Sequence, residues 1–200
     1  MQRALVLAVV LIVVLAVQAA AEDPRILEIR RQYNAVSELA GREDEHSGDG
    51  ALTHTLSYRN IMPGTGYRNR VVSYFHEDTP HPEGRVGELG QSLRKVTLED
   101  NISAVRFHRE YLYSPEGDLL FCFLREEGFP GGEKRFYFYG GELIRVVIEP
   151  LGNGADERFA PFQGDGSFPP RIVEEAAAVA RAAEEHHGVF RFLVKHQFID

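Results

Sequence analysis

The sequence predicts an α+β protein: an antiparallel β-meander of about seven strands packed with an N-terminal and a C-terminal helix. Apolar residues recur with a helical period near both ends of residues 22–200. Between residues 52 and 148 they form short alternating runs, rich in β-branched and aromatic residues and separated by turn sequences. Because helices and strands are segregated along the chain, we expect the helices to cover faces of one sheet.

The first 21 residues are typical of a secretory signal peptide. Arg3 precedes an apolar run over residues 4–17, and Ala19 and Ala21 precede the acidic Glu22. The run is shorter than the ~20 residues that a membrane-spanning helix needs. We expect cleavage after about Ala21; an uncleaved N-terminal anchor is the alternative.

Composition bounds the compartment and the partners of the expected single domain, residues 22–200. The formal net charge is −8 and the sequence contains one cysteine, Cys122. A single thiol excludes an intramolecular disulfide and a lipid-modified cysteine at the cleavage site, so we expect a soluble protein in the bacterial periplasm or secreted. An acidic chain without a run of Lys or Arg argues against binding to nucleic acid or to anionic lipid.

The first helix is expected over residues 24–40. Asp23 is placed to cap it, Pro24 suits its first position, and Gly41 is expected to end it in the left-handed conformation. The polar residues 42–51 are interpreted as a mobile linker. The apolar stripe of the helix comprises Ile26, Ile29, Tyr33, Val36 and Ala40.

Two turns support consecutive hairpins in the sheet. Gly140 and Gly141 form a two-residue turn sequence, and Ser114–Asp118 fits a type I turn with Gly117 in a left-handed position. Residues 77–90 and the Gly- and Pro-rich residues 150–169 are expected to be long loops. The strands are expected at residues 52–61, 70–76, 93–99, 104–113, 118–126, 134–139 and 142–149.

The last segment follows Pro169 and Pro170 and carries an apolar stripe from Ile172 to Val194. The stripe keeps its helical phase across Gly188, which favours one helix, straight or bent, to about His196. A helix followed by a strand over residues 189–194 is the alternative.

No catalytic, cofactor-binding or metal residue is assigned from the sequence, and no cofactor is expected. Cys122 lies in a strand between two Phe residues and is expected in the core. His76 and His81 flank an acidic loop that has the donors of a metal site, but loops collect polar residues in any case. Glu184 and His187 have ligand spacing, but two ligands do not make a site.

One feature suggests a binding surface. With simple hairpin registers, Arg109 would lie opposite Phe123, and Phe136 opposite Arg145, so that arginines alternate with aromatic rings. The alternative is a sheet face on which Arg stems cover rings at the water boundary. The other expected pairs are Tyr113–Leu119, Tyr111–Phe121 and Phe107–Arg125. The candidate ligand or partner face comprises Arg109, Tyr111, Tyr113, Phe121, Phe123, Arg125, Phe136 and Arg145.

The phrases EYLYSPEGDLLFCFLREEG and EKRFYFYGGELIRVVIEP resemble the tyrosine-rich hairpins of exported bacterial β-meander proteins and, more distantly, MORN-type β-hairpin repeats. The resemblance covers about residues 107–150, and the MORN glycine pattern between hairpins is absent. It implies an exported β-meander and carries over no site residue.

The sequence therefore predicts an exported, non-enzymatic binding or interaction domain. Its partner would be a protein, a peptide or a component of the cell envelope, and the sequence does not indicate an oligomeric state. The alternatives are an envelope hydrolase whose site is built from the long loops, and an inhibitor of a secreted enzyme.

Overall fold

A computed structural model describes residues 22–41, 52–64, 66–80, 89–128, 130–152 and 156–196. The expected signal peptide, the whole of the expected linker (residues 42–51), and His81 lie outside these residues. The elements are α2 (Pro24–Ala40), β1 (Leu52–Met62), β2 (Gly66–Pro80), β3 (Leu89–Ile102), β4 (Val105–Tyr113), β5 (Leu119–Glu127), β6 (Gly131–Tyr139), β7 (Glu142–Leu151), the 3₁₀ turn η1 (Glu157–Phe159), β8 (Phe162–Asp165) and α3 (Pro170–His196).

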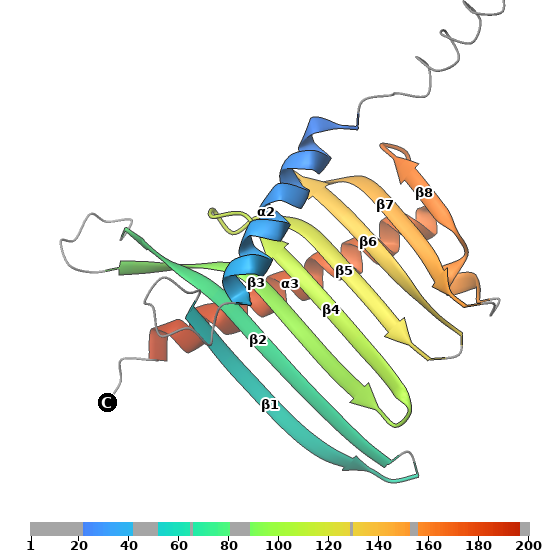
Figure 1. Cartoon of the computed structure of the whole chain (residues 1–200), viewed down its shortest axis with the longest axis horizontal. Helices are drawn as coiled ribbons and strands as arrows, with labels where there is room; N and C mark the ends of the chain where they lie inside the picture. Colours follow the sequence, from blue (N-terminus) through green and yellow to red (C-terminus); the bar gives the residue numbers. More distant parts are fainter. Residues whose placement is uncertain are drawn as a thin grey trace, which may run out of the picture.

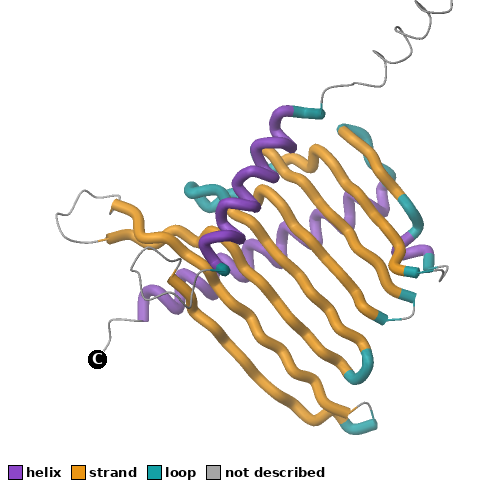
Figure 2. The backbone as a smooth tube through the Cα atoms, viewed as in Figure 1, coloured by secondary structure: helices purple, strands orange, loops and turns teal. Residues whose placement is uncertain are grey.

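All eight strands form one antiparallel sheet in sequence order, with α2 on one face and α3 on the other (Figures 1 and 2). The predicted α+β meander with two flanking helices is confirmed. The strand that sequence analysis missed is β8, inside the expected loop 150–169. Its four residues are too few for a period-2 pattern, and it pairs with only part of β7.

Helix α2 begins as predicted and ends differently. The Asp23 side chain accepts a hydrogen bond from the backbone N–H of Arg25, and Pro24 occupies the first turn. The expected left-handed stop at Gly41 is wrong, because Gly41 has φ −78° and donates its N–H to the Ser37 carbonyl. The buried face of the helix packs Ile26, Ile29 and Val36 against Leu112, Phe121, Tyr137 and Ile144 of the sheet.

Helix α3 is continuous through Gly188, which confirms one helix and excludes a strand over residues 189–194. Its stripe is buried against the other sheet face, where the Tyr113 hydroxyl donates to the Ala183 carbonyl at 2.8 Å. Phe190 is buried beyond the glycine, so the helical phase persists to the end of the stripe. The core on this face includes Tyr74, Val96, Tyr111, Phe136, Val146, Ile172, Ala176 and Val179.

The hairpin turns are correct, but the registers beyond them are not. Gly140 and Gly141 have φ 58° and 80°, as a two-residue turn with positive φ requires. Tyr139 pairs with Glu142, but the register then shifts by one residue and places Tyr137 opposite Arg145. In the β4–β5 hairpin Tyr113 pairs with Leu119 as predicted, and the register then shifts by one residue between Tyr113 and Leu112. The observed pairs there are Leu112–Phe121, Tyr111–Cys122, Glu110–Phe123, Arg109–Leu124, His108–Arg125 and Phe107–Glu126.

The two shifts divide the predicted binding face. An extra residue in one strand of a pair turns every later side chain to the opposite face relative to its expected partner. The face that combined all eight candidate residues is therefore wrong. Arg109, Tyr111, Tyr113 and Phe136 belong to the α3 face, whereas Phe121, Phe123, Arg125 and Arg145 belong to the α2 face.

The central position of Phe136 in the α3-face core predicts a large effect of its removal. Phe136 has no exposed surface, so Phe136→Ala should lower the free energy of unfolding by about 3–5 kcal/mol. Urea denaturation followed by circular dichroism measures this change. Leu27→Ala, at a half-exposed position on α2, is the matched control and should change stability by less than about 1 kcal/mol. An equal effect of the two variants would contradict the assigned core.

Candidate functional site

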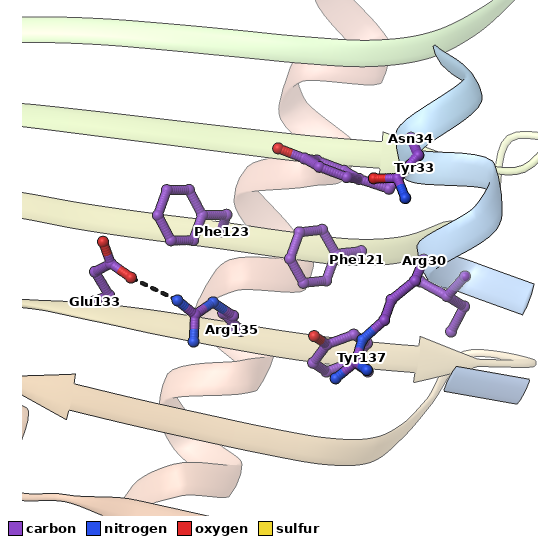
Figure 3. Close-up of a pocket in the computed structure, with 9 residues that line it drawn as sticks. Arg30, Tyr33, Asn34, Phe121, Phe123, Glu133, Arg135 and Tyr137 are labelled. Carbon is purple, nitrogen blue, oxygen red and sulfur yellow. Dashed lines mark hydrogen bonds and ion pairs between the residues drawn. The ribbon is translucent and has the colours of Figure 1, made fainter. Parts of the chain in front are cut away.

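A cleft of about 380 Å³ opens between α2 and strands β5 and β6 (Figure 3). It lies on the α2 face, and both a helix and the sheet contribute side chains to it. Its aromatic residues are Tyr33, Phe121, Phe123 and Tyr137, and its polar residues are Arg30, Asn34, Glu133 and Arg135.

The strand period and the register place the aromatic rings of the cleft. Phe121 and Phe123 are two residues apart on β5 and so share a face, and Tyr137 of β6 pairs with Phe121. The Phe121 and Tyr137 ring centroids are 4.9 Å apart, and Tyr33 of α2 meets Phe121 edge-on at 5.3 Å. These contacts hold the rings in place without a ligand.

Two arginines border the aromatic part of the cleft, and both are paired with carboxylates. The Arg135 guanidinium lies 5.8 Å from the Phe123 ring centroid and bridges Glu133 at 2.6 Å and Glu149 at 2.7 Å. Arg30 lies 5.8 Å from the Tyr137 ring and donates to Glu22 at 2.9 Å. The cleft therefore combines an aromatic interior with charges of both signs at its border.

A buried polar network fixes Tyr33 beside the cleft. Glu110, which is 8% exposed, accepts hydrogen bonds from the Tyr33 hydroxyl and, at 2.9 Å, from His108 Nε2. Lys95 Nζ lies 3.2 Å from the same carboxylate and donates to Ser37 Oγ of α2 at 2.9 Å. Burial alone would raise the pKa of Glu110, but these hydrogen bonds and the Lys95 charge lower it to about 2.

His108 occupies the centre of a Glu99–His108–Glu110 chain. Its Nε2 is bonded to Glu110 and its Nδ1 to Glu99, so both ring nitrogens face carboxylates and the imidazolium form is favoured. The hydrogen bond to Glu110 raises the pKa of His108 against the opposing effect of burial. The His108 ring also contacts Phe123, with centroids 5.9 Å apart, which connects the network to the cleft.

This raised pKa predicts a pH-dependent contribution of His108 to stability. A group whose pKa is higher in the folded than in the unfolded state stabilises the protein below its unfolded pKa and loses that effect as the pH rises through its folded pKa. His108→Gln should therefore cost more stability at pH 5.5, which is below the unperturbed His pKa of ~6.5, than at pH 9. Urea denaturation at the two pH values measures this difference. His187→Gln is the control, because the pKa of His187 is lowered by burial. A cost for His108→Gln that is the same at both pH values would contradict the imidazolium assignment.

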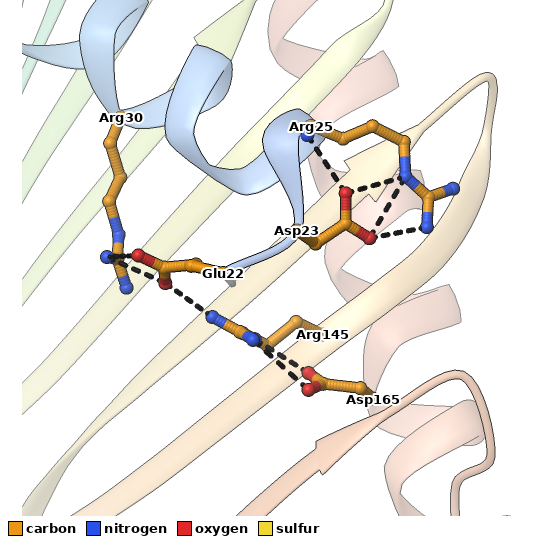
Figure 4. Close-up of polar contacts among 6 residues, drawn as sticks. All are labelled: Glu22, Asp23, Arg25, Arg30, Arg145 and Asp165. Atoms are coloured by element: carbon orange, nitrogen blue, oxygen red, sulfur yellow. Dashed lines mark hydrogen bonds and ion pairs between the residues drawn. The ribbon is translucent and has the colours of Figure 1, made fainter. Parts of the chain in front are cut away.

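Arg145 lies on the α2 face within a cluster of carboxylates (Figure 4). Its Nε donates to Asp165 at 2.6 Å and one terminal nitrogen donates to Glu22 at 2.7 Å, while Glu22 also binds Arg30. The Asp165 hydrogen bond raises the pKa of Arg145. Arg145 is opposite Tyr137, not Phe136, and it joins the start of α2 to β8 instead of standing free at a recognition face.

This pairing predicts a modest structural role for Arg145. Glu22 and Asp165 retain substantial exposure, so both are hydrated if their partner is lost. Arg145→Met should lower the free energy of unfolding by about 1 kcal/mol or less and leave ligand binding in the cleft unchanged. Arg181→Met, on the exposed side of α3, is the control and should change neither quantity. A loss of binding in Arg145→Met without a loss of stability would favour a recognition role.

Four of the remaining candidates, Arg109, Tyr111, Tyr113 and Phe136, lie in the α3-face core or at its border. Arg125 lies on the α2 face, where it pairs with Glu127 and Glu133 outside the cleft. Tyr111, Tyr113 and Cys122 are buried, and burial raises the pKa of the Cys122 thiol. Arg109 lies on the same face of β4, two residues before Tyr111, and is exposed. These residues do not reach the cleft.

Of the histidines considered as metal ligands, the two that the structure describes, His76 and His187, pack against aromatic rings. His76 is buried and stacks on His54 with centroids 4.9 Å apart, and burial is the main reason that its pKa falls to about 4. His187 packs near Tyr113, with centroids 5.9 Å apart. Within the described residues, no group of three or more His, Cys, Asp or Glu side chains is placed to hold a metal ion.

Sequence analysis identified Phe121 and Phe123 but missed the rest of the cleft and its network. The sequence pattern places Tyr33 only in the apolar stripe of its helix, and it gives Glu110 and His108 no distinct role. The available signal was the alternation of charged and polar residues with apolar ones along β4, which contributes His108 and Glu110 to the same face. That alternation does not indicate which helix packs there.

No protein-family model, curated protein or solved structure matches this chain. Among the described residues, none of the helices has the length and apolar character needed to cross a membrane.

Proposed function

We propose that this chain is an exported, non-enzymatic binding domain that holds a flat apolar group in the cleft between α2 and β5–β6. The observation that carries the proposal is the set of aromatic rings from three different elements, α2, β5 and β6, around one cavity (Figure 3). A volume of about 380 Å³ lies within the range of small-molecule sites and accommodates an aromatic side chain of a peptide or a ring of similar size.

The border of the cleft supports recognition of a polar edge on the same ligand. Arg30 and Arg135 each lie near an aromatic ring, and Asn34 and Glu133 add uncharged and negative groups. Ion pairs with Glu22 and Glu133 orient the two guanidinium groups before a ligand arrives, which lowers the entropic cost of binding. The cleft therefore suits a ring with a charged or polar substituent.

The polar network supports binding in preference to catalysis. Glu110 is engaged with His108, Lys95 and Tyr33, and His108 also binds Glu99. Burial raises the pKa of the Tyr33 phenol. A buried carboxylate with a pKa of about 2 and three donors is a poor proton acceptor near neutral pH. These groups anchor α2 and shape one wall of the cleft.

Fluorescence titration with anilinonaphthalene sulfonate, an aromatic anion, tests the proposal. The protein should bind the probe, and Phe123→Ala should weaken binding about tenfold, which corresponds to ~1.4 kcal/mol. Arg135→Met should weaken binding of this anion because it removes the guanidinium nearest to Phe123. Phe107→Ala and Arg106→Met, which lie outside the cleft, are the matched controls and should bind as the unaltered protein does.

Circular dichroism of each variant separates binding from unfolding, since this probe also binds partly unfolded proteins. Equal affinity of all four variants would contradict the proposal. A hydrolytic activity in a native extract that is lost when a loop carboxylate is replaced, but not in the cleft variants, would favour the hydrolase alternative.

A further inference from the structure

Strand β1 forms one border of the sheet and leaves its outer backbone groups without a strand partner among the described residues. It pairs with β2 along its whole length, from Leu52–His76 to Met62–Gly66, and the register has no bulge. Alternate N–H and C=O groups of an edge strand point outward, where another extended strand can bind them. The edge is long, at eleven residues.

This edge lacks the features that normally prevent association. Its sequence, LTHTLSYRNIM, contains no Pro and no Lys, and Arg59 is its only formally charged residue. Proline, lysine, bulges and short length are the usual means of protecting an edge. The opposite edge differs, because β8 has only four residues and follows Pro161 directly.

Apolar side chains are exposed along β1. Leu56 is 43% exposed and Tyr58 is 45% exposed, and their even spacing places both on the α3 face of the sheet. Ile61, on the α2 face, is 68% exposed. Large exposed apolar side chains on an unpaired edge are typical of an interaction surface.

Two arginines of β2 pack against the Tyr58 ring. The guanidinium groups of Arg68 and Arg70 lie 6.0 and 5.7 Å from its ring centroid. Both arginines bind Asp100, which is 4% exposed; Arg68 donates to it at 2.6 and 3.0 Å. Tyrosine is one of the residue types enriched among those that contribute most to binding at protein interfaces.

We propose that β1 is a dimerisation edge that pairs antiparallel with β1 of a second copy, about a two-fold axis at Ser57. Ser57 is the middle residue of β1, so this register gives the longest overlap between the two strands. It places Leu56 opposite Tyr58 of the second copy on one face of the joined sheet. It also places Arg59 opposite Thr55 of the second copy, so the two Arg59 charges do not oppose each other.

The difference between the β1 and β8 edges favours a closed dimer over an open-ended polymer of this protein. Pairing β1 with β8 of another molecule would satisfy only four residues and leave the rest of β1 exposed. Pairing of β1 with itself uses the same surface on both molecules and closes after two copies. The arrangement of apolar residues about Ser57 is self-complementary, as a two-fold interface requires.

Analytical ultracentrifugation of the purified protein, expressed in full so that any processing occurs, tests the oligomeric state. The unaltered protein should be a dimer, and Leu56→Lys and Tyr58→Glu should each weaken self-association at least about tenfold, or ~1.4 kcal/mol. In neither variant does the introduced charge oppose a like charge across the interface. The expected loss of affinity therefore arises from removal of the Leu56–Tyr58 contact and from burial of the introduced charge. Tyr139→Lys, at an exposed position in the β6–β7 hairpin, is the control and should remain dimeric.

Mixing the Leu56→Lys and Tyr58→Glu variants tests the register. In a mixed dimer, the introduced lysine of one copy opposes the introduced glutamate of the other, and the second Leu56–Tyr58 pair is intact. The mixture should therefore form a dimer that salt weakens. Circular dichroism verifies that each variant is folded. A monomeric unaltered protein, a dimer that survives both single changes, or a failure of the two variants to associate would overturn the proposal. A monomer that binds extended peptides instead would assign the edge to a different partner.

Discussion

The position of α2 depends on the burial of Glu110. Helix α3 is held to its face of the sheet by a long apolar stripe, whereas α2 buries only Ile26, Ile29 and Val36 fully and packs Tyr33 beside them. A buried carboxylate without partners is unfavourable by several kcal/mol, so Glu110 requires its donors. Tyr33 of α2 is one of them, and Lys95, which also binds Ser37 of α2, is another. This requirement fixes α2 above β5 and β6 and thereby creates the cleft.

The fold class could be predicted because periodicity and turn chemistry are local. The stripe of α3 keeps its phase across Gly188, and the adjacent Gly140 and Gly141 specify a tight turn wherever the hairpin packs. A bulge, by contrast, leaves no comparable signal in alternating apolar sequence. Near Leu112 and Tyr137 the strands are apolar on both faces, so a shift of one residue changes no hydrophobic pattern.

The candidate site was only partly predictable for the same reason. Phe121 and Phe123 were identified because they are near in sequence to a recognisable turn, and both line the cleft. Their assigned neighbours were wrong, because Arg109 lies on the opposite face and Arg135 takes the place beside Phe123. Tyr33 is far from these residues in the sequence. Its approach to Phe121 depends on how a helix packs across the sheet, which the sequence pattern of neither element specifies.

The geometry of the sheet connects the proposed ligand site with the proposed dimer. The cleft lies over β5 and β6, and the strand order separates it from β1 by the width of β2, β3 and β4. Pairing at β1 would therefore leave the cleft accessible. A two-fold axis perpendicular to a sheet keeps each face on its own side, so both α2 helices and both clefts would point the same way. Two sites on one face would allow a dimer to bind a repeated ligand more tightly than either copy alone, through the raised effective concentration of the second site.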